Sequence, residues 1–190
     1  MNLLPEDAVD RIADGCREIG KICQAQGIQQ WEIVASQSYG HSIDIEAGKI
    51  SLAAGGGEGG YGIRVVEDGR FGYAYLVDLG SADYAIQQAR DIAKMSPSVA
   101  GFTLPSEQTA EKVAGLFDKN ILSIGPEDLL EQADAILSEV ASLDERAIVT
   151  GGGLGVGASA GAILSSEGIE SSGVTTSHGI GVQVSIEADG

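Results

Sequence analysis

Hydrophobic residues recur at every third or fourth position in three separate segments of the chain, which is the spacing of one face of an α-helix. The first segment follows Pro5 and stops at Gly27, residue types that favour the start of a helix and the position just past its end. The second follows Ser81 and ends near Met95, and the third begins at Pro126. The apolar positions are Val9, Ile12, Cys16, Ile19 and Cys23 in the first segment, Ala82, Ala85, Ile86, Ala89, Ile92 and Ala93 in the second, and Leu129, Leu130, Ala133, Ile136, Leu137 and Val140 in the third. The pattern predicts three amphipathic helices.

Between the first two helices the hydrophobic period changes to two, which indicates strands. The predicted strands are WEIVASQS, HSIDIEA, GKISLAA, YGIRVVE and FGYAYLV, with turns at residues 39–40, 47–48 and 68–69. The glycine-rich segment GGGEGG between the third and fourth strands is expected to be a flexible hairpin loop. Strand-like sequence resumes at Ala147.

These elements predict an α+β fold, in which helices pack on one face of one or more antiparallel sheets. A single domain is expected over residues 1–190. Residues 1–96 are expected to hold a helix, antiparallel strands and a second helix. An irregular connection follows over residues 97–125, and residues 126–190 hold a helix and a second β region.

The two β regions resemble each other. Residues 42–69 can be laid beside residues 161–190 with one insertion, so that Gly48 matches Gly168 and a predicted turn at residues 60–62 matches one at residues 179–181. The match indicates two related β regions, although glycine-rich segments also align by chance.

The chain ends on GIGVQVSIEADG, an alternating strand followed by a strong hairpin signal at Asp189 and Gly190. No residue remains for a return strand, so we expect the sequence to be a fragment of a longer protein. An unpaired last strand exposes backbone donors and acceptors. It therefore predicts pairing or swapping with another chain, or disorder of the last residues.

Acidic residues outnumber basic ones by 28 to 11, which gives a formal net charge of -17. Such a surface disfavours nucleic acid and anionic membranes, because both are recognised largely through Lys and Arg. No apolar run approaches the ~20 residues of a membrane span, and the N-terminus lacks the pattern of a signal peptide. A cytoplasmic location is expected.

The segment GGGLGVGASAG offers two apparent catalytic motifs. Gly153, Gly155 and Ala158 fit the dinucleotide pattern G-x-G-x-x-A, but that site also needs a helix at the glycines and an acid about 20 residues later. Ser159 lies in G-x-S-x-G, but too little chain follows for the rest of a hydrolase sheet. A glycine-rich strand is the favoured interpretation, and an independent enzyme at this segment is the weaker alternative.

The chain is poor in metal ligands. His41 and His178 are its only histidines, and neither belongs to an H-x-x-x-H or H-E-x-x-H pattern. Cys16 and Cys23 lie two helical turns apart, about 10 Å, which is too far for a disulfide, so buried free thiols are expected. In GGGEGG, Glu58 repels phosphate and no Lys-Ser/Thr follows. We assign no catalytic, cofactor-binding or metal-binding residue, and we name no substrate-binding residue.

The order of these segments resembles the N-terminal part of the TldD/PmbA (TldE) metallopeptidase family. The resemblance rests on GHSIDIEAGKI, GYGIRVVEDGRFGYAYLVDLG and SADYAIQQARDIAKM, followed by GPEDLLEQADAILSEV and the segment from DERAIVTGGG to the end. The family shows an S-V-x-x-x-G-x-V hairpin and G-x-G-V-R-V and G-x-G-x-A-S-T-x-D-L strands. Its later N-S-x-G is similar to SSEGIE, with Ser165 in place of the asparagine. The resemblance covers nearly the whole chain and favours a PmbA-like parent.

The resemblance implies a part in a zinc metallopeptidase system that processes small unfolded peptides. In the family the metal-binding H-E-x-x-x-H helix lies after this domain, so zinc would belong to the missing C-terminal part or to a partner subunit. No cofactor is expected in this chain, and the chain alone is expected to be inactive.

The resemblance also implies a homo- or heterodimer with a TldD/PmbA-type subunit, enclosing a chamber for peptides. PmbA-type members carry the label of a modulator of DNA gyrase, to which the net charge of -17 lends no support as direct DNA contact. The alternative is a self-standing protein-binding or scaffold module that uses exposed strand edges.

Overall fold

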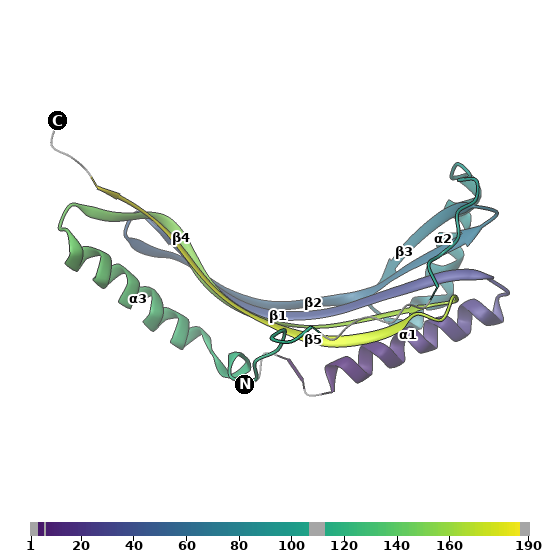
Figure 1. The fold of residues 1–190 in the computed structure, drawn as a ribbon, viewed down its shortest axis with the longest axis horizontal. Coiled ribbons are helices and arrows are strands. Elements are labelled where there is room, and N and C mark those ends of the chain that lie inside the picture. Colours follow the sequence, from purple (N-terminus) through teal and green to yellow (C-terminus); the bar gives the residue numbers. More distant parts are fainter. Residues whose placement is uncertain (1–3, 6, 107–112, 187–190) are drawn as a thin grey trace.

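The structure is a computed structural model, and it describes residues 4, 5, 7–106 and 113–186. One long, curved antiparallel sheet runs the length of the molecule, and helices lie along it at both ends (Figure 1). The elements are α1 (Ala8–Ala25), β1 (Gln30–Glu46), β2 (Lys49–Glu67), β3 (Arg70–Leu76), the 3-10 turn η1 (Leu79–Ser81), α2 (Ala82–Met95), the 3-10 turn η2 (Ile121–Ser123), α3 (Pro126–Leu143), β4 (Ala147–Ser165) and β5 (Glu170–Ile186). The predicted α+β class is therefore confirmed.

The strand order in the sheet is β3-β2-β1-β4-β5, so β1 lies at the centre between two long hairpins. The hairpin of β1 and β2 turns at Ala47 and Gly48, which both have positive φ, and the turn between β2 and β3 has the same geometry at Asp68 and Gly69. Both turns were predicted from their second residue, because glycine adopts the left-handed region without a steric penalty and so forms the tight turn that fits twisted strands. The second hairpin, β4 and β5, turns near Gly168.

The three predicted helices are present, and they share one face of the sheet. α1 packs on β1 and β4, α2 packs on β3 and β2, and α3 packs on β4 and β1 at the other end of the sheet. Cys16 and Cys23 of α1 are buried as free thiols, as their spacing predicted. None of the helices that the structure describes is long and apolar enough to span a membrane.

Alternation along the strands separates the two faces of the sheet. The face toward the helices, here called the helix face, holds the core; its buried strand residues include Ile33, Ala35, Ile43 and Ile45 of β1, Ile63 and Val65 of β2, and Leu154, Val156, Ala158, Ala160 and Ala162 of β4. The opposite face, here called the open face, carries the residues in between, among them Ser36, Ser38, Gly40 and Ser42 of β1, Gly56, Glu58 and Gly60 of β2, and Gly153, Gly155, Gly157 and Ser159 of β4. The core is therefore a single layer between the sheet and the helices.

Several predicted turns are wrong, because the strands are longer than expected. Residues 39–40 lie inside β1, and GGGEGG, predicted as a loop, lies inside β2. The segments at residues 60–62 and 179–181 are also strand rather than turn. The predicted turn at Asp189 and Gly190 lies outside the described residues.

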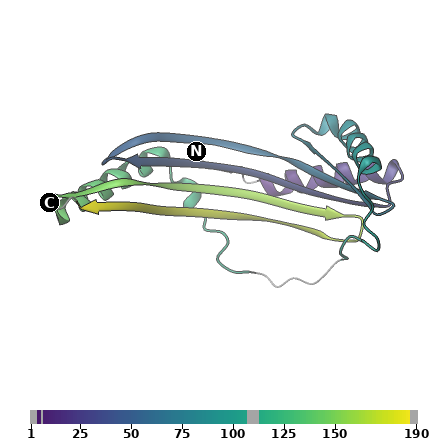
Figure 2. The ribbon, with the colours of Figure 1, turned by 90° about the horizontal axis from the view of Figure 1, so that it is seen from above.

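The connection predicted as irregular between α2 and α3 contains one 3-10 turn, η2, within its described parts. The part of it around Leu116 and Asp118 lies beside the outer edge of β5 (Figure 2). The backbone N–H of Thr176 donates to the carbonyl oxygen of Leu116 at 2.9 Å, and the backbone N–H of Asp118 donates to Oγ1 of Thr176 at 2.8 Å. The middle of the β5 edge is therefore occupied by this connection.

Candidate functional site

The outer edge of β2 is unpaired over most of its length. β1 pairs with β2 from end to end, whereas β3 pairs only with residues 61–67. Across the described part of the chain, no strand covers the outer edge of residues 49–60, here called the β2 edge. Nearly all of these side chains are exposed. A strand edge of this kind presents free backbone donors and acceptors to any extended chain.

Glycine makes the β2 edge smooth, and neighbouring rings explain why glycine is required there. A Cβ on Gly57 would overlap the ring of Tyr39, and a Cβ on Gly55 would overlap the imidazole of His41. Both rings reach across from β1 and lie over the glycines. The rings therefore replace the missing side chains, and the glycine-rich segment remains in a regular strand.

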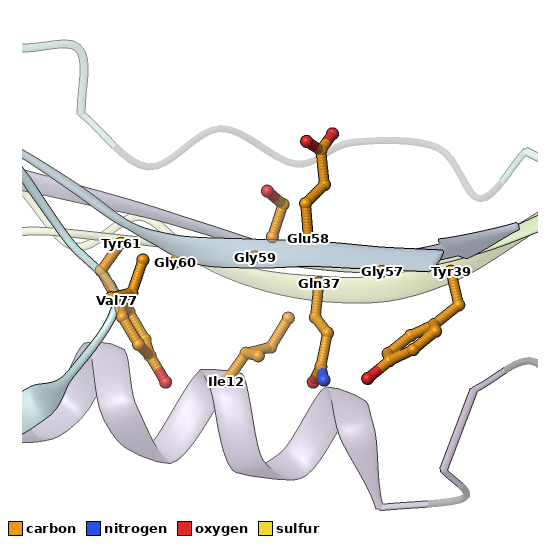
Figure 3. Close-up of a pocket in the computed structure, with 10 residues that line it drawn as sticks. Ile12, Gln37, Tyr39, Gly57, Glu58, Gly59, Gly60, Tyr61 and Val77 are labelled. Carbon is orange, nitrogen blue, oxygen red and sulfur yellow. The ribbon is translucent and has the colours of Figure 1, made fainter. Parts of the chain in front are cut away.

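A cavity of about 260 Å³ lies beneath the β2 edge on the helix face. Gln37, Tyr39 and Tyr61 point from the sheet toward α1, where Ile12 forms the floor (Figure 3). Val77, just after the end of β3, stands at its side and is 72% exposed. The cavity is open on one side because β3 ends at Leu76, so that no described strand pairs with the outer edge of β2 before Tyr61.

A second, more open cavity of about 520 Å³ continues the first along α1. The two share Ile12, Gln37, Tyr61 and Val77. The second adds charged side chains, which are Arg11, Asp14, Glu18 and Asp78. It is therefore net acidic, with three carboxylates against one guanidinium.

Most of these charges already have partners. Nη2 of Arg11 donates to Oε1 of Gln37 at 3.3 Å, and Arg17 pairs with Asp14 at 2.6 Å. A carboxylate oxygen of Asp78 accepts from the backbone N–H of Gly80 at 3.2 Å. Glu18 makes no ion pair with any residue whose position is described.

Tyr61 joins the two cavities. Its phenol packs against Gly15 of α1, where a Cβ would overlap the ring. Burial raises the pKa of Tyr61, and the nearby Cys16 and Glu18 act in the same direction. The phenol is therefore neutral at physiological pH and is available as a hydrogen-bond donor.

The motifs of the GGGLGVGASAG segment do not form catalytic sites. Gly153, Gly155 and Ala158 lie within β4, so the helix that a dinucleotide site requires is absent at these residues. Ser159 also lies on β4, where its hydroxyl is hydrogen-bonded to that of Ser38 at 2.9 Å. The favoured interpretation, a glycine-rich strand, is confirmed for this segment.

The two histidines lie in one row of the helix face, on either side of Val156. Their strands are two spacings apart, roughly 10 Å. Nε2 of His178 lies 3.1 Å from Oε1 of Gln132 on α3. The described residues contain no group of three His, Cys, Asp or Glu side chains that could hold a metal. These described residues therefore do not fit a zinc site. The family resemblance places the zinc ligands in another part of the protein.

Residues 31–93, which span β1 to α2, match the family model described as PmbA/TldA metallopeptidase domain 1. These residues resemble the first domain of the PmbA/TldD family. An uncharacterized protein of Methanocaldococcus jannaschii is 29% identical to this chain over 150 residues, which make up 79% of this chain and 34% of the relative.

Solved structures share the fold of this chain. TldE from Thermococcus kodakarensis has a TM-score of 0.80 at 20% identity, over 93% of this chain and 39% of that one. A protein from Bacteroides thetaiotaomicron named as a modulator of DNA gyrase has a TM-score of 0.82 at 20% identity, over 95% of this chain and 42% of that one. A Thermotoga maritima protein named in the same way has a TM-score of 0.78 at 12% identity, over 93% of this chain and 40% of that one. The chain thus spans about a third of the curated relative and about two fifths of these structures.

The β2 edge and its cavities were not found from the sequence as a site. The edge depends on the point where β3 stops, and the cavities join residues of α1, β1, β2 and the segment after β3. Only the glycine-rich segment was a signal, and it was interpreted as a loop.

Proposed function

We propose that this chain is the non-catalytic N-terminal part of a PmbA-like protein in a zinc metallopeptidase system that processes small unfolded peptides. Its sheet contributes one wall of a chamber formed with a second TldD/PmbA-type subunit, and the β2 edge holds an extended peptide there. The unpaired β2 edge is the observation that carries the proposal.

Main-chain pairing suits this task. A peptide added as a strand is held by hydrogen bonds between backbones, which are the same for every sequence apart from proline. The small residues of the β2 edge leave both faces of the added strand accessible. Peptides of many sequences can therefore bind, provided that they are unfolded.

Two neighbouring proline variants test the proposal on the protein side. Successive residues of a strand direct their backbone N–H groups to opposite sides, so of Ala53 and Ala54 one pairs with β1 and the other faces the free edge. Proline at the residue that pairs with β1 should lower the free energy of unfolding, because a hydrogen bond inside the sheet is lost. Proline at the residue that faces the free edge should leave stability unchanged. It should weaken the binding of a labelled, extended heptapeptide at least ~10-fold, because a donor at the edge is lost.

Fluorescence anisotropy measures the binding, and urea unfolding measures the stability. Ala54→Val keeps every backbone N–H and serves as the matched control, with binding unchanged. Wild-type affinity in both folded proline variants would contradict the proposal.

The alternative, a self-standing scaffold module, is favoured by the same exposed edge. The two functions differ in what the edge pairs with. A scaffold module would bind a folded partner through a strand of that partner and would show no affinity for short unfolded peptides.

A further inference from the structure

We propose that the two joined cavities beneath the β2 edge receive the long basic side chain, lysine or arginine, of the peptide that pairs with this edge. The inference rests on the proposed function, and it adds a side-chain preference to the pairing of backbones.

Register decides which peptide side chains reach the cavities. β3 pairs Leu76 with Tyr61, so a strand that continues the line of β3 next meets Gly60 and then Gly59. Tyr61 points toward α1 (Figure 3), and residues two apart on a strand share a face. A peptide residue opposite Gly59 therefore directs its side chain toward α1, into the cavity between the rings of Tyr61 and Tyr39.

The shape of the two cavities fits a long, flexible side chain. The first cavity offers a passage of mixed polarity, lined by Ile12, Val77, Gln37 and the aromatic rings of Tyr39 and Tyr61. The second continues it along α1 to the charged groups. A lysine or arginine can place its methylene stem against the first and its charged head in the second.

The charges favour a cation over a neutral side chain. The second cavity is lined by Asp14, Glu18, Asp78 and Arg11, and Asp14 is already paired with Arg17 at 2.6 Å. Arg11 is held by Asp7 and Gln37, so its guanidinium is turned to partners of its own. Glu18 has no ion pair among the described residues, and it is the carboxylate that a bound cation would neutralise. The ring of Tyr61, which lines both cavities, adds a cation–π attraction for the charged head.

A set of acetylated and amidated heptapeptides of alternating threonine and valine tests the preference. Their central residue is lysine, arginine, norleucine, which keeps the stem of lysine without the charge, or glutamate. We expect the lysine and arginine peptides to bind about five-fold tighter than the norleucine peptide and the glutamate peptide to bind weakest. The advantage of lysine over norleucine should shrink as salt is raised, because salt screens the charges.

Glu18→Gln should reduce the advantage of lysine over norleucine, whereas Glu127→Gln on α3, a change of the same kind far from the edge, should leave it intact. Equal binding of all four peptides would overturn this inference and leave the proposed function standing. Tightest binding of the norleucine peptide would overturn it in favour of an apolar pocket. Binding of no peptide would overturn the proposed function and the inference with it. So would a dimer in sedimentation equilibrium that saturating peptide leaves intact but the proline variant on the free side of the β2 edge dissociates, because the edge would then belong to a second copy of the chain.

Discussion

The β2 edge and the edge of β5 lie on opposite sides of the sheet and have different surroundings. β5 is exposed except at Val174 and Thr176, and its middle is hydrogen-bonded to the connection at Leu116 and Asp118. The β2 edge is free along residues 49–60, and it lies above two cavities that end among carboxylates. An exposed strand therefore does not by itself make a binding site. The β2 edge differs from the β5 edge because it combines free backbone groups with cavities that can accept a peptide side chain.

The largest effect is expected where β3 limits the β2 edge. A Cβ on Gly72 of β3 would overlap the carbonyl oxygen of Ala89 in α2, and backbone cannot move aside as a side chain can. In Gly72→Val we expect a loss of at least ~3 kcal/mol in the free energy of unfolding. Urea unfolding measures it. Gly173→Val on β5, where a Cβ meets no atom within 4 Å, is the matched control and should change stability by less than about 0.5 kcal/mol. Equal losses in both variants would contradict the packing of α2 on β3.

Alkaline pH should loosen α1, which forms the floor of the first cavity. Burial raises the pKa of Cys16 from 9.0 to about 11 and that of Cys23 to about 12. The stabilising effect of the protonated thiols is thus complete below the pH of about 9 at which unfolded thiols titrate, and it is lost as pH rises toward 12. At pH 10 we expect a loss of about 1.4 kcal/mol for each thiol.

Urea unfolding at pH 8 and pH 10 measures this loss. The double variant Cys16→Ala, Cys23→Ala should be less stable at pH 8 but should lose the part of the pH dependence that the thiols cause. The same alkaline loss in that variant would contradict burial of the thiols as its cause.

Neighbouring glycines of the β2 edge should respond differently to the same substitution. In Gly57→Val the new side chain displaces the ring of Tyr39 toward the cavity, so we expect a loss of about 1 kcal/mol in stability and weaker peptide binding. In Gly56→Val a Cβ enters open space on the other face, and both properties should be unchanged. Urea unfolding and peptide anisotropy on the two variants provide the comparison. Identical behaviour would argue against the ring over Gly57.

The smallest effect concerns the β5 edge. Thr176→Val removes the Oγ1 acceptor of the Asp118 N–H, and we expect a loss of about 0.5–1 kcal/mol and faster hydrogen exchange near Asp118. The hydroxyl of Thr175 makes no hydrogen bond to any described residue, so Thr175→Val serves as the control. Neither variant should gain peptide binding at β5. A gain in Thr176→Val would mean that a free edge is sufficient.

Helices and tight turns were predictable because local signals determine them. Pro126, Ser81 and Gly27 mark helix ends, and the pairs at residues 47–48 and 68–69 adopt the positive φ angles that their glycines permit. Serine before a helix commonly caps it through its hydroxyl, but the hydroxyl of Ser81 donates to the carbonyl of Asp78 and does not cap α2.

The length of β1 and β2 was not predictable from local signals. In the sequence, Tyr39 and Gly40 resemble a turn and GGGEGG resembles a loop. In the structure both are strand, because the rings of Tyr39 and His41 lie over Gly57 and Gly55. Such packing between strands is a tertiary effect that a single sequence does not reveal. The cavities were hidden for the same reason, because Ile12, Gln37 and Val77 meet only in the folded chain.

Hydrogen–deuterium exchange with and without a saturating lysine-centred heptapeptide tests the central claim most directly, because it reports the two edges in one experiment. The account predicts that the peptide slows exchange in residues 49–60 and leaves residues 170–186 unchanged. Protection confined to β5, or no protection on either edge at saturating peptide, would contradict the assignment of the β2 edge as the peptide site.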